Sequence, residues 1–286
     1  MKKINPLDVF LWSFRRNEND VVKLYDSLSE VMQLSTGGDM LNFGFWDEST
    51  ISPIDAQEKL CTIFAELSHL KSAENILDVG SGLSAPAFFW AEKYPNLSIT
   101  SVNINNSQLV SAKNKRSLNS KFEVRFINST ATSLPFADDS MDRILAFESA
   151  QHFKPLDFFI SECKRILKSD GILSLAIPIL GKDFSQPLLK LGILSMTWSS
   201  EHYSKNHILS TVNKNNFEIL EEKLIGANVY PPLADYYSKN RESIQKKILK
   251  NYSTSVEKIL WRSIKKMRET SEKNIIDYLL LSCKKN

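Results

Sequence analysis

The chain has 286 residues, of which 42% are hydrophobic and 24% are charged, and both fractions are close to those of ordinary globular proteins. No apolar run approaches the roughly 18 residues that a membrane-spanning helix needs, and no signal-peptide core develops near the N-terminus. The formal net charge of +3 is too small to indicate nucleic-acid binding. We therefore expect a cytoplasmic protein with no membrane span and no nucleic-acid partner, and the oligomeric state stays open.

The cysteines and histidines suggest neither a disulfide framework nor a metal site. The three cysteines, Cys61, Cys163 and Cys283, are far apart and odd in number, and no Cys-x-x-Cys pair occurs. The four histidines stand at no zinc-like spacing from them. The sequence therefore predicts reduced thiols and no bound metal.

Charge is distributed unevenly, because positions 239–286 hold thirteen Lys or Arg residues against five Asp or Glu residues. A solvated basic helix face is the ordinary explanation of such a segment. Attraction for an anionic substrate or an acidic surface is the alternative.

The N-terminal part is expected to be helical. Apolar residues recur at helical steps from about residue 20. The stretch 35–39, which contains two glycines, ends this helix. A glycine-punctuated aromatic loop follows at 41–46, and a second helix is predicted over 53–70. The sequence thus predicts an N-terminal helical cap over residues 1–70.

From residue 75 onward, strands and helices alternate, which is the pattern of a parallel sheet covered on both faces. The strands are expected at 75–79, 97–104, 123–127, 141–147 and 171–178. The helices are expected at 84–94, 107–119 and 156–167, the last one closed by a turn at 168–171.

The C-terminal part continues this pattern and then changes. A helix is expected at 205–215, a strand at 217–224, a long helical segment at 236–273 and an apolar strand at 277–283. No internal repeat interrupts the chain, so we expect one catalytic domain with helical additions. Its parts are a core over 71–235, a helical lid over 236–275 and a final strand of the core sheet over 276–286.

The most informative segment runs from Ile76 to Ser84, where a buried strand ends, two glycines turn the chain and a helix begins. Gly80 and Gly82 let the backbone adopt positive φ and approach a ligand closely, and the helix N-terminus offers unpaired N–H groups. Such a loop also serves dinucleotides, but Ala85 stands where the third glycine of G-x-G-x-x-G is required. This disfavours a nicotinamide-dependent oxidoreductase without excluding it.

Polar or turn-forming residues follow the other strands as well. The second strand ends at Asn103-Ile104, about 25 residues beyond the glycines, where a nucleoside ribose is normally held. Thr130-Ala131 follows the third strand, where an adenine edge is expected, and Phe147 to Phe153 follows the fourth. Ligands of an open α/β sheet bind at this carboxyl edge.

These segments resemble the class I S-adenosylmethionine-dependent methyltransferases, within them the small-molecule group of sugar O-methyltransferases and sterol and tocopherol C-methyltransferases. The family's D-x-G-x-G, D-A-x-x-L-P-F and D-x-S-F-D motifs are matched by residues 78–82, 130–136 and 138–142. Its E-S-x-x-H-F and E-x-x-R-V-L-K-P-G-G motifs are matched by 148–153 and 162–171. Its Y-D, L-H-x-G-Y-W and G-Y-L-L-L-x-A-R-K elements are matched by 25–26, 41–46 and 277–285.

The resemblance extends from about residue 20 to the C-terminus. It implies an α/β fold with a Rossmann-like, seven-stranded methyltransferase sheet, N-terminal helices and a helical lid before the last strand. It also implies S-adenosyl-L-methionine as cofactor and a small-molecule substrate of natural-product, secondary metabolism. The residues that it assigns to cofactor binding are Tyr25, Asp78, Gly80, Gly82, Asn103, Ile104, Gln108, Thr130, Ala131 and Phe147.

Two positions depart from the family's pattern. Asn103 replaces the acid that accepts from both ribose hydroxyls, although sterol methyltransferases also carry Asn there. An amide accepts without charge assistance, so an aspartate at 103 is expected to hold the cofactor at least as well. Thr130 replaces the aspartate that accepts from the adenine amino group, and a hydroxyl can also accept.

Methyl transfer is an in-line displacement, so such an enzyme mainly aligns donor and acceptor, and a base is needed where the acceptor loses a proton. His152 is the candidate base, because it follows the fourth strand at the cofactor edge. A histidine packed beside the loop is the other interpretation. Glu148 is expected either to orient His152 or to cap the following helix.

Aromatic residues near this edge favour, as a group, a hydrophobic or aromatic acceptor, although most of them singly belong to the core. They are Trp12, Phe43, Phe45, Trp46, Trp198, Tyr203, Tyr230, Tyr236 and Tyr237. Two other functions stay open. One is a methyltransferase fold that binds the cofactor but catalyses a non-methylating reaction such as cyclisation, and the other is the nicotinamide-dependent oxidoreductase.

Overall fold

The computed structural model describes residues 17–36, 38–116, 123–181, 187–198 and 200–286. Trp12 lies outside these residues. The strands in the described part are β1 Asn75–Val79, β2 Ser98–Asn103, β3 Val124–Asn128, β4 Met141–Phe147, β5 Leu167–Leu180, β6 Phe217–Leu224 and β7 Ile276–Lys285. The α-helices there are α2 Glu18–Thr36, α3 Pro53–Leu67, α4 Ala85–Lys93, α5 Asn106–Arg116, α6 Leu156–Ile166, α7 Pro187–Leu191, α8 Leu194–Thr197, α9 Lys205–Lys214, α10 Gly226–Asn251 and α11 Thr254–Glu272.

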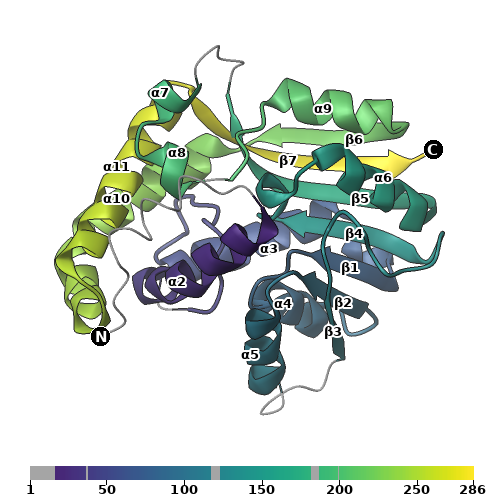
Figure 1. Ribbon diagram of the computed structural model, residues 1–286, viewed down its shortest axis with the longest axis horizontal. Coiled ribbons are helices and arrows are strands. Elements are labelled where there is room, and N and C mark those ends of the chain that lie inside the picture. The colour runs from purple at the N-terminus through teal and green to yellow at the C-terminus, as the bar shows by residue number, and fades with distance from the viewer. Residues whose placement is uncertain (1–16, 37, 117–122, 182–186, 199) are drawn as a thin grey trace.

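Within the described residues, seven strands form one sheet in the order β3-β2-β1-β4-β5-β7-β6 (Figure 1). Strands β1 to β5 pair in parallel, and β7 is antiparallel to both of its neighbours, β5 and β6. The strand order reverses between β1 and β4, which creates a crevice at their carboxyl ends. The predicted Rossmann-like, seven-stranded fold is confirmed.

Helices cover both faces of the sheet, and adjacent residues of each strand point to opposite faces. In β1, Ile76 packs into the cluster that contains Phe64 of α3 and Trp90 of α4. Its neighbour Leu77 packs on the other face, into the cluster that contains residues of α6 and α9, among them Phe159. The near-continuous apolar strands thus reflect a sheet covered by helices on both sides.

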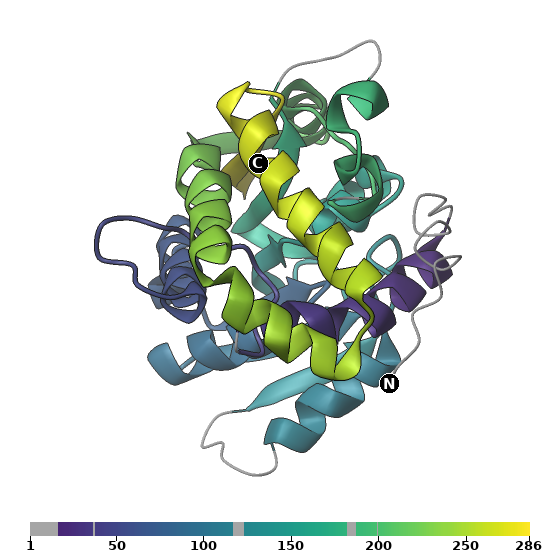
Figure 2. The ribbon, with the colours of Figure 1, turned by 90° about the vertical axis from the view of Figure 1, so that its left-hand side faces the viewer.

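Helix α2 lies between the sheet and a hairpin made of α10 and α11 (Figures 1 and 2). Glu30 of α2 accepts hydrogen bonds from the Tyr252 hydroxyl at 2.8 Å and from the Asn251 side chain at 3.3 Å, at the tip of the hairpin. Asp26 of α2 accepts from Asn105 at 2.8 Å and from Ser107 at 3.1 Å, just beyond β2. These contacts fasten α2 over the carboxyl edge of the sheet.

The segment 236–273 differs from the sequence-based expectation, because it is part of two helices rather than one. Helix α10 begins earlier, at Gly226, and ends at Asn251, and α11 follows after a break at Tyr252 and Ser253. Pro231 and Pro232 lie inside α10, and prolines inside a helix normally indicate its end. The boundary predicted between residues 235 and 236 therefore falls within a helix. The domain division itself stays a prediction.

The turn expected at 168–171 is instead an irregularity within β5. The strand begins at Leu167, directly after α6, and its pairing with β4 shifts between Met141 and Arg143. Asp170 adopts a φ of 62° there, a conformation that Asp and Asn tolerate better than most residues. The predicted helix over 53–70 also ends earlier, at Leu67.

Candidate active site

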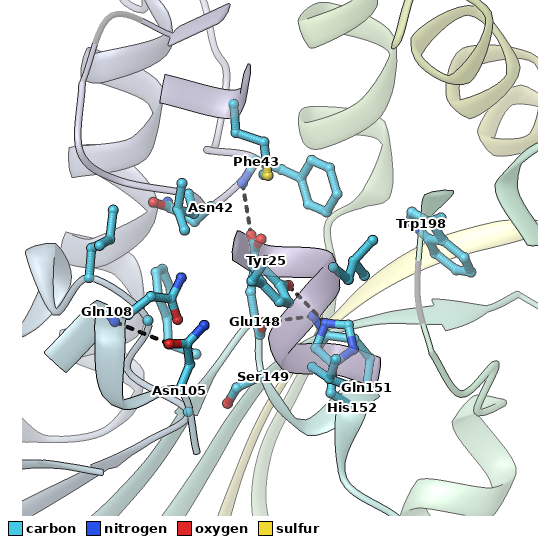
Figure 3. Close-up of a pocket in the computed structure, with 18 of the residues that line it drawn as sticks. Tyr25, Asn42, Phe43, Asn105, Gln108, Glu148, Ser149, Gln151, His152 and Trp198 are labelled. Atoms are coloured by element: carbon cyan, nitrogen blue, oxygen red, sulfur yellow. Dashed lines mark hydrogen bonds between the residues drawn. The ribbon is translucent and has the colours of Figure 1, made fainter. Parts of the chain in front are cut away.

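A cavity of about 270 Å³ lies at the carboxyl edge of the sheet, beneath α2 and the α10–α11 hairpin (Figure 3). Ten of the sequence-predicted site residues line it: Tyr25, Gly80, Gly82, Asn103, Ile104, Gln108, Ala131, Phe147, Glu148 and His152. Asp78 and Thr130 do not line it. The structure therefore gathers strand ends that lie up to about 70 residues apart in the sequence around one cavity.

The two glycines of the loop after β1 have different surroundings. Both have positive φ, 77° at Gly80 and 55° at Gly82. A Cβ on Gly80 would lie 2.4 Å from the Cβ of Ser149, whereas a Cβ on Gly82 would meet only Leu41 at 3.9 Å. Gly80 is therefore required by packing against the end of β4, and the surface of Gly82 is left open to a ligand.

The Asn103 side chain is held by the protein through its amide NH₂ group. This group donates to the Gly82 carbonyl at 3.2 Å and to Oε1 of Gln108 at 2.9 Å. Gln108 in turn donates to Ser29 Oγ of α2 at 3.1 Å. Asn103 thus joins the glycine loop to α5 and, through Gln108, to α2. The amide oxygen is the one acceptor of its side chain, and the Asn105 N–H contacts this oxygen at 3.4 Å.

Asp78 and Thr130 lie beside the cavity rather than on its wall. Asp78 is buried, and burial raises the pKa of its carboxyl to about 7. The Thr130 hydroxyl donates to Glu18 of α2 and lies 3.1 Å from the Thr132 hydroxyl. Glu18 lines the cavity, so the Thr130 hydroxyl is bonded to a residue of the cavity wall and does not itself line the cavity.

Glu148 links β4 to two other parts of the chain. Its Oε1 accepts from the backbone N–H of Phe43 at 3.0 Å and from the Tyr278 hydroxyl at 2.8 Å. Burial raises the pKa of Glu148 to about 8, and the two hydrogen bonds oppose this rise. Neither expected role is observed: its hydrogen bonds go to Phe43 and Tyr278, and the backbone carbonyl accepts from Gln151 at 2.6 Å.

His152 has a hydrogen-bond partner at each ring nitrogen. Nε2 lies 2.8 Å from the Tyr25 hydroxyl, and Nδ1 lies 2.6 Å from Oγ of Ser200. The Tyr25 and His152 rings meet edge to face, with centroids 5.3 Å apart. Figure 3 shows Tyr25 of α2 against His152 at the cavity wall. Ser200, which follows α8, takes the orienting position that the sequence suggests for Glu148.

The part of the cavity wall formed by α2, α10 and α11 is mostly apolar, although Ser35 and Ser263 also line it. Residues of α11, including Ile259, Ile264 and Met267, face residues of α2 such as Val31 across it. Of the aromatic residues that the sequence singles out, Phe43, Trp198, Tyr236 and Tyr237 line the cavity. The others in the described part, Phe45, Trp46, Tyr203 and Tyr230, do not. The Tyr237 hydroxyl is buried and has no hydrogen-bond partner among the described residues.

Comparison with known proteins agrees with this geometry. A family model described as a methyltransferase domain matches residues 77–175. Erythromycin 3''-O-methyltransferase of Saccharopolyspora erythraea is 24% identical over 296 aligned residues, which cover 96% of this chain and 93% of that protein. The chain belongs to the class I S-adenosylmethionine-dependent methyltransferases.

Two solved structures show the same fold as this methyltransferase. The [4+2]-cyclase SpnF superposes with a TM-score of 0.74 at 22% identity, over 94% of this chain and 96% of that one. Mycolic acid cyclopropane synthase CmaA1, solved with SAH and CTAB, superposes with a TM-score of 0.77 at 17% identity, over 91% and 95%. Among the described residues of the methyltransferase, no helix is long and apolar enough to cross a membrane.

The cavity of this methyltransferase fits a cofactor of the S-adenosylmethionine type, which carries hydroxyl and ammonium donors. Gly82 leaves open space at the cavity wall. Asn42 lines the cavity with a buried side-chain oxygen that has no partner among the described residues. The sequence matches residues 41–46 to a family motif but gives no signal for Asn42, Glu18 or Ser200 as site residues. Their sites depend on contacts between distant segments, so no local pattern could have indicated them.

Proposed function

We propose that this enzyme transfers a methyl group from S-adenosyl-L-methionine to a small, hydrophobic or aromatic acceptor of the natural-product type. The observation that carries the proposal is one continuous cavity with two unlike ends. One end is formed by the glycine loop and the polar strand ends, and the other by the apolar surface of α2, α10 and α11. In Figure 3, Tyr25 and His152 lie between Asn105 and Gln108 on one side and Trp198 on the other, a position that suits a reaction between a polar cofactor and an apolar acceptor.

In this proposal the polar end holds the cofactor. Gly82 provides the close backbone approach, the Asn103 carbonyl accepts from ribose, and the Asn42 carbonyl accepts from the ammonium group. The bound cofactor supplies a methyl group on a positively charged sulfur. The chain itself aligns the acceptor, excludes water with α2, and takes up the acceptor's proton through His152.

The apolar end supports the choice of acceptor. A charged metabolite would lose hydration against Ile259, Ile264 and Met267, and neither α10 nor α11 contributes a charged residue to the cavity wall to pair with it. The unpartnered Tyr237 hydroxyl favours an apolar body that also carries one hydrogen-bonding group. The relative from Saccharopolyspora erythraea is by its name an erythromycin 3''-O-methyltransferase, and its similarity over nearly the whole chain supports an acceptor of the natural-product type. The three cysteines are buried free thiols, which favours a reducing, cytoplasmic location.

A second candidate function is a non-methylating reaction, such as a cyclisation, in the same cavity. The Tyr25 hydroxyl occupies Nε2 of His152, so this nitrogen is already engaged within the protein. A reaction without proton transfer needs no base, and the contact therefore favours this second candidate. In that case the cofactor would bind without being consumed.

The two candidates separate in one experiment. The enzyme is incubated with small-molecule extract and S-adenosyl-L-methionine carrying an isotope-labelled methyl group, and mass spectrometry follows label in products and formation of S-adenosylhomocysteine. Methyl transfer gives both signals in equal amount, and a cyclase gives neither. Calorimetry with S-adenosylhomocysteine and NADH serves as the binding control. Binding of NADH alone would overturn both candidates in favour of an oxidoreductase.

A further inference from the structure

The hydrogen bonds of His152 raise a question about the base. A histidine that takes a proton directly from an acceptor needs a ring nitrogen with an available lone pair. Here the nitrogen toward α2, Nε2, lies 2.8 Å from the Tyr25 hydroxyl, and Nδ1 lies 2.6 Å from the Ser200 hydroxyl. Either Tyr25 leaves before each turnover, or Tyr25 stands between the acceptor and the imidazole and passes the proton on.

The structure favours the second alternative, because helix α2, which carries Tyr25, is held at the sheet edge, and the Tyr25 ring packs edge to face against His152. The next residue, Asp26, accepts from both Asn105 and Ser107 beyond β2, and Ser29 accepts from Gln108. Displacing Tyr25 with its helix would break these contacts at the very edge where the cofactor is held. The Tyr25 side chain also lines the cavity itself, so its hydroxyl can meet an acceptor while the helix stays closed.

We propose that Tyr25 is a catalytic residue that contacts a hydroxyl group of the acceptor and relays its proton to His152, and that Ser200 is a positioning residue. This rests on the proposed methyl transfer and narrows its acceptor to one methylated at oxygen. The relay requires the tautomer in which Nδ1–H donates to the Ser200 hydroxyl, since the Nε2 lone pair then faces the Tyr25 hydroxyl. The arrangement follows the general logic of a base whose second nitrogen is held by a third group.

The step balances without a further reactant. The acceptor's hydroxyl proton moves to the Tyr25 oxygen as the Tyr25 proton moves to Nε2 of His152. The acceptor oxygen forms a bond to the methyl carbon as the bond from that carbon to sulfur breaks. The positive charge that begins on sulfur ends on the imidazolium, where the Nδ1–H bond to Ser200 persists.

The first test needs no acceptor. Long-range proton–nitrogen NMR on histidine-labelled protein saturated with S-adenosylhomocysteine reports which ring nitrogen carries the proton, and His152→Gln identifies the signal among the four histidines. The proposal requires the Nδ1–H form in the wild type and a shift toward Nε2–H in Ser200→Ala, with Ser200→Thr restoring the wild-type signal. A wild-type His152 in the Nε2–H form would overturn the relay, because Tyr25 would then only accept.

The second test uses the acceptor found with the labelled cofactor. Tyr25→Phe keeps the ring contact with His152 and removes only the hydroxyl, so kcat is expected to fall roughly 100- to 10,000-fold, with calorimetric affinity for S-adenosylhomocysteine within about twofold. Tyr94→Phe, at a tyrosine that does not line the cavity, is the matched control. A Tyr25→Phe kcat at or above the wild-type value would show that Tyr25 blocks the base.

The chemistry of the product tests the same inference independently. A methyl group found on oxygen supports the relay, and one found on carbon or on an amine nitrogen overturns it. If the wild type forms no S-adenosylhomocysteine with any acceptor, the proposed methyl transfer fails, whereas the NMR result still decides whether Tyr25 donates to His152. The two failures are therefore distinguishable.

Discussion

The carboxyl group of Glu148 accepts the backbone N–H of Phe43 at 3.0 Å and so joins the end of β4 to the aromatic loop that covers the cavity. The same oxygen accepts from Tyr278 of β7. One buried acid thus connects three segments that are distant in the sequence, and the protonation state of this acid matters for stability.

Glu148→Gln is expected to stabilise the fold at alkaline pH. Burial raises the pKa of Glu148 from 4.5 to about 8, so the folded state binds this proton more tightly than the unfolded state does. The wild type therefore loses stability relative to the glutamine variant as pH rises from about 4.5 to 8, and no further above it. Glutamine retains both bonds at Oε1. Melting temperatures of the two proteins from about pH 5 to 9 check this, and parallel pH profiles would contradict it.

Gly80→Ala is expected to destabilise the fold by packing rather than by occupying ligand space. The new Cβ would lie 2.4 Å from Ser149 Cβ and in a backbone of positive φ, which together cost about 2–4 kcal/mol. Ser149→Gly should restore part of this loss of unfolding free energy in the double variant, as denaturant unfolding would show.

In Gly82→Ala the protein should still fold, with an unfolding free energy lower by about 1 kcal/mol, and calorimetry should show weaker binding of S-adenosylhomocysteine. Equal stability losses at both glycines would refute the distinction.

Asn103→Asp reverses the outcome expected from sequence. A carboxylate cannot donate, so it would replace two hydrogen bonds by repulsion against the Gly82 carbonyl at 3.2 Å and Gln108 Oε1 at 2.9 Å. We expect S-adenosylhomocysteine binding about tenfold weaker in calorimetry, which corresponds to about 1.4 kcal/mol. The exposed Asn96→Asp is the matched control for the added charge. Tighter binding by Asn103→Asp would show that Gln108 turns its amide to donate and that the ribose interaction dominates.

The features that the sequence predicts well are local ones. Strands β1, β4 and β6 occupy the predicted residues, because apolar strands bounded by turns are evident from neighbouring positions. The positive φ of Gly80 and Gly82 is predictable, because a strand–turn–helix junction requires it. Eight of the ten predicted site residues that line the cavity lie at or after the ends of parallel strands, which all end at the same edge, and the other two, Tyr25 and Gln108, lie on α2 and α5.

The features that the sequence does not predict depend on contacts between distant segments. Ser200 reaches His152 across 48 positions, and Thr130 turns to Glu18 across 112 positions. The early start of α10 escapes detection since Pro231 and Pro232 indicate a helix end when read locally. In each case packing between distant segments, and not the local sequence preference, determines the hydrogen-bond partner or the helix boundary.

Tyr237→Phe is expected to separate stability from substrate binding. The Tyr237 hydroxyl is buried without a hydrogen-bond partner among the described residues, and an unpaired buried hydroxyl costs about 1–3 kcal/mol. Phenylalanine removes that cost while the ring contact with Trp261, at 5.7 Å between centroids, is kept. The variant should therefore melt a few degrees higher than the wild type. Its KM for the acceptor identified with the labelled cofactor should rise with little change in kcat, because the acceptor loses its hydrogen bond to the Tyr237 hydroxyl. A variant that melts several degrees lower would show that the hydroxyl is already bonded within the folded protein, and an unchanged KM would place the acceptor's polar group elsewhere.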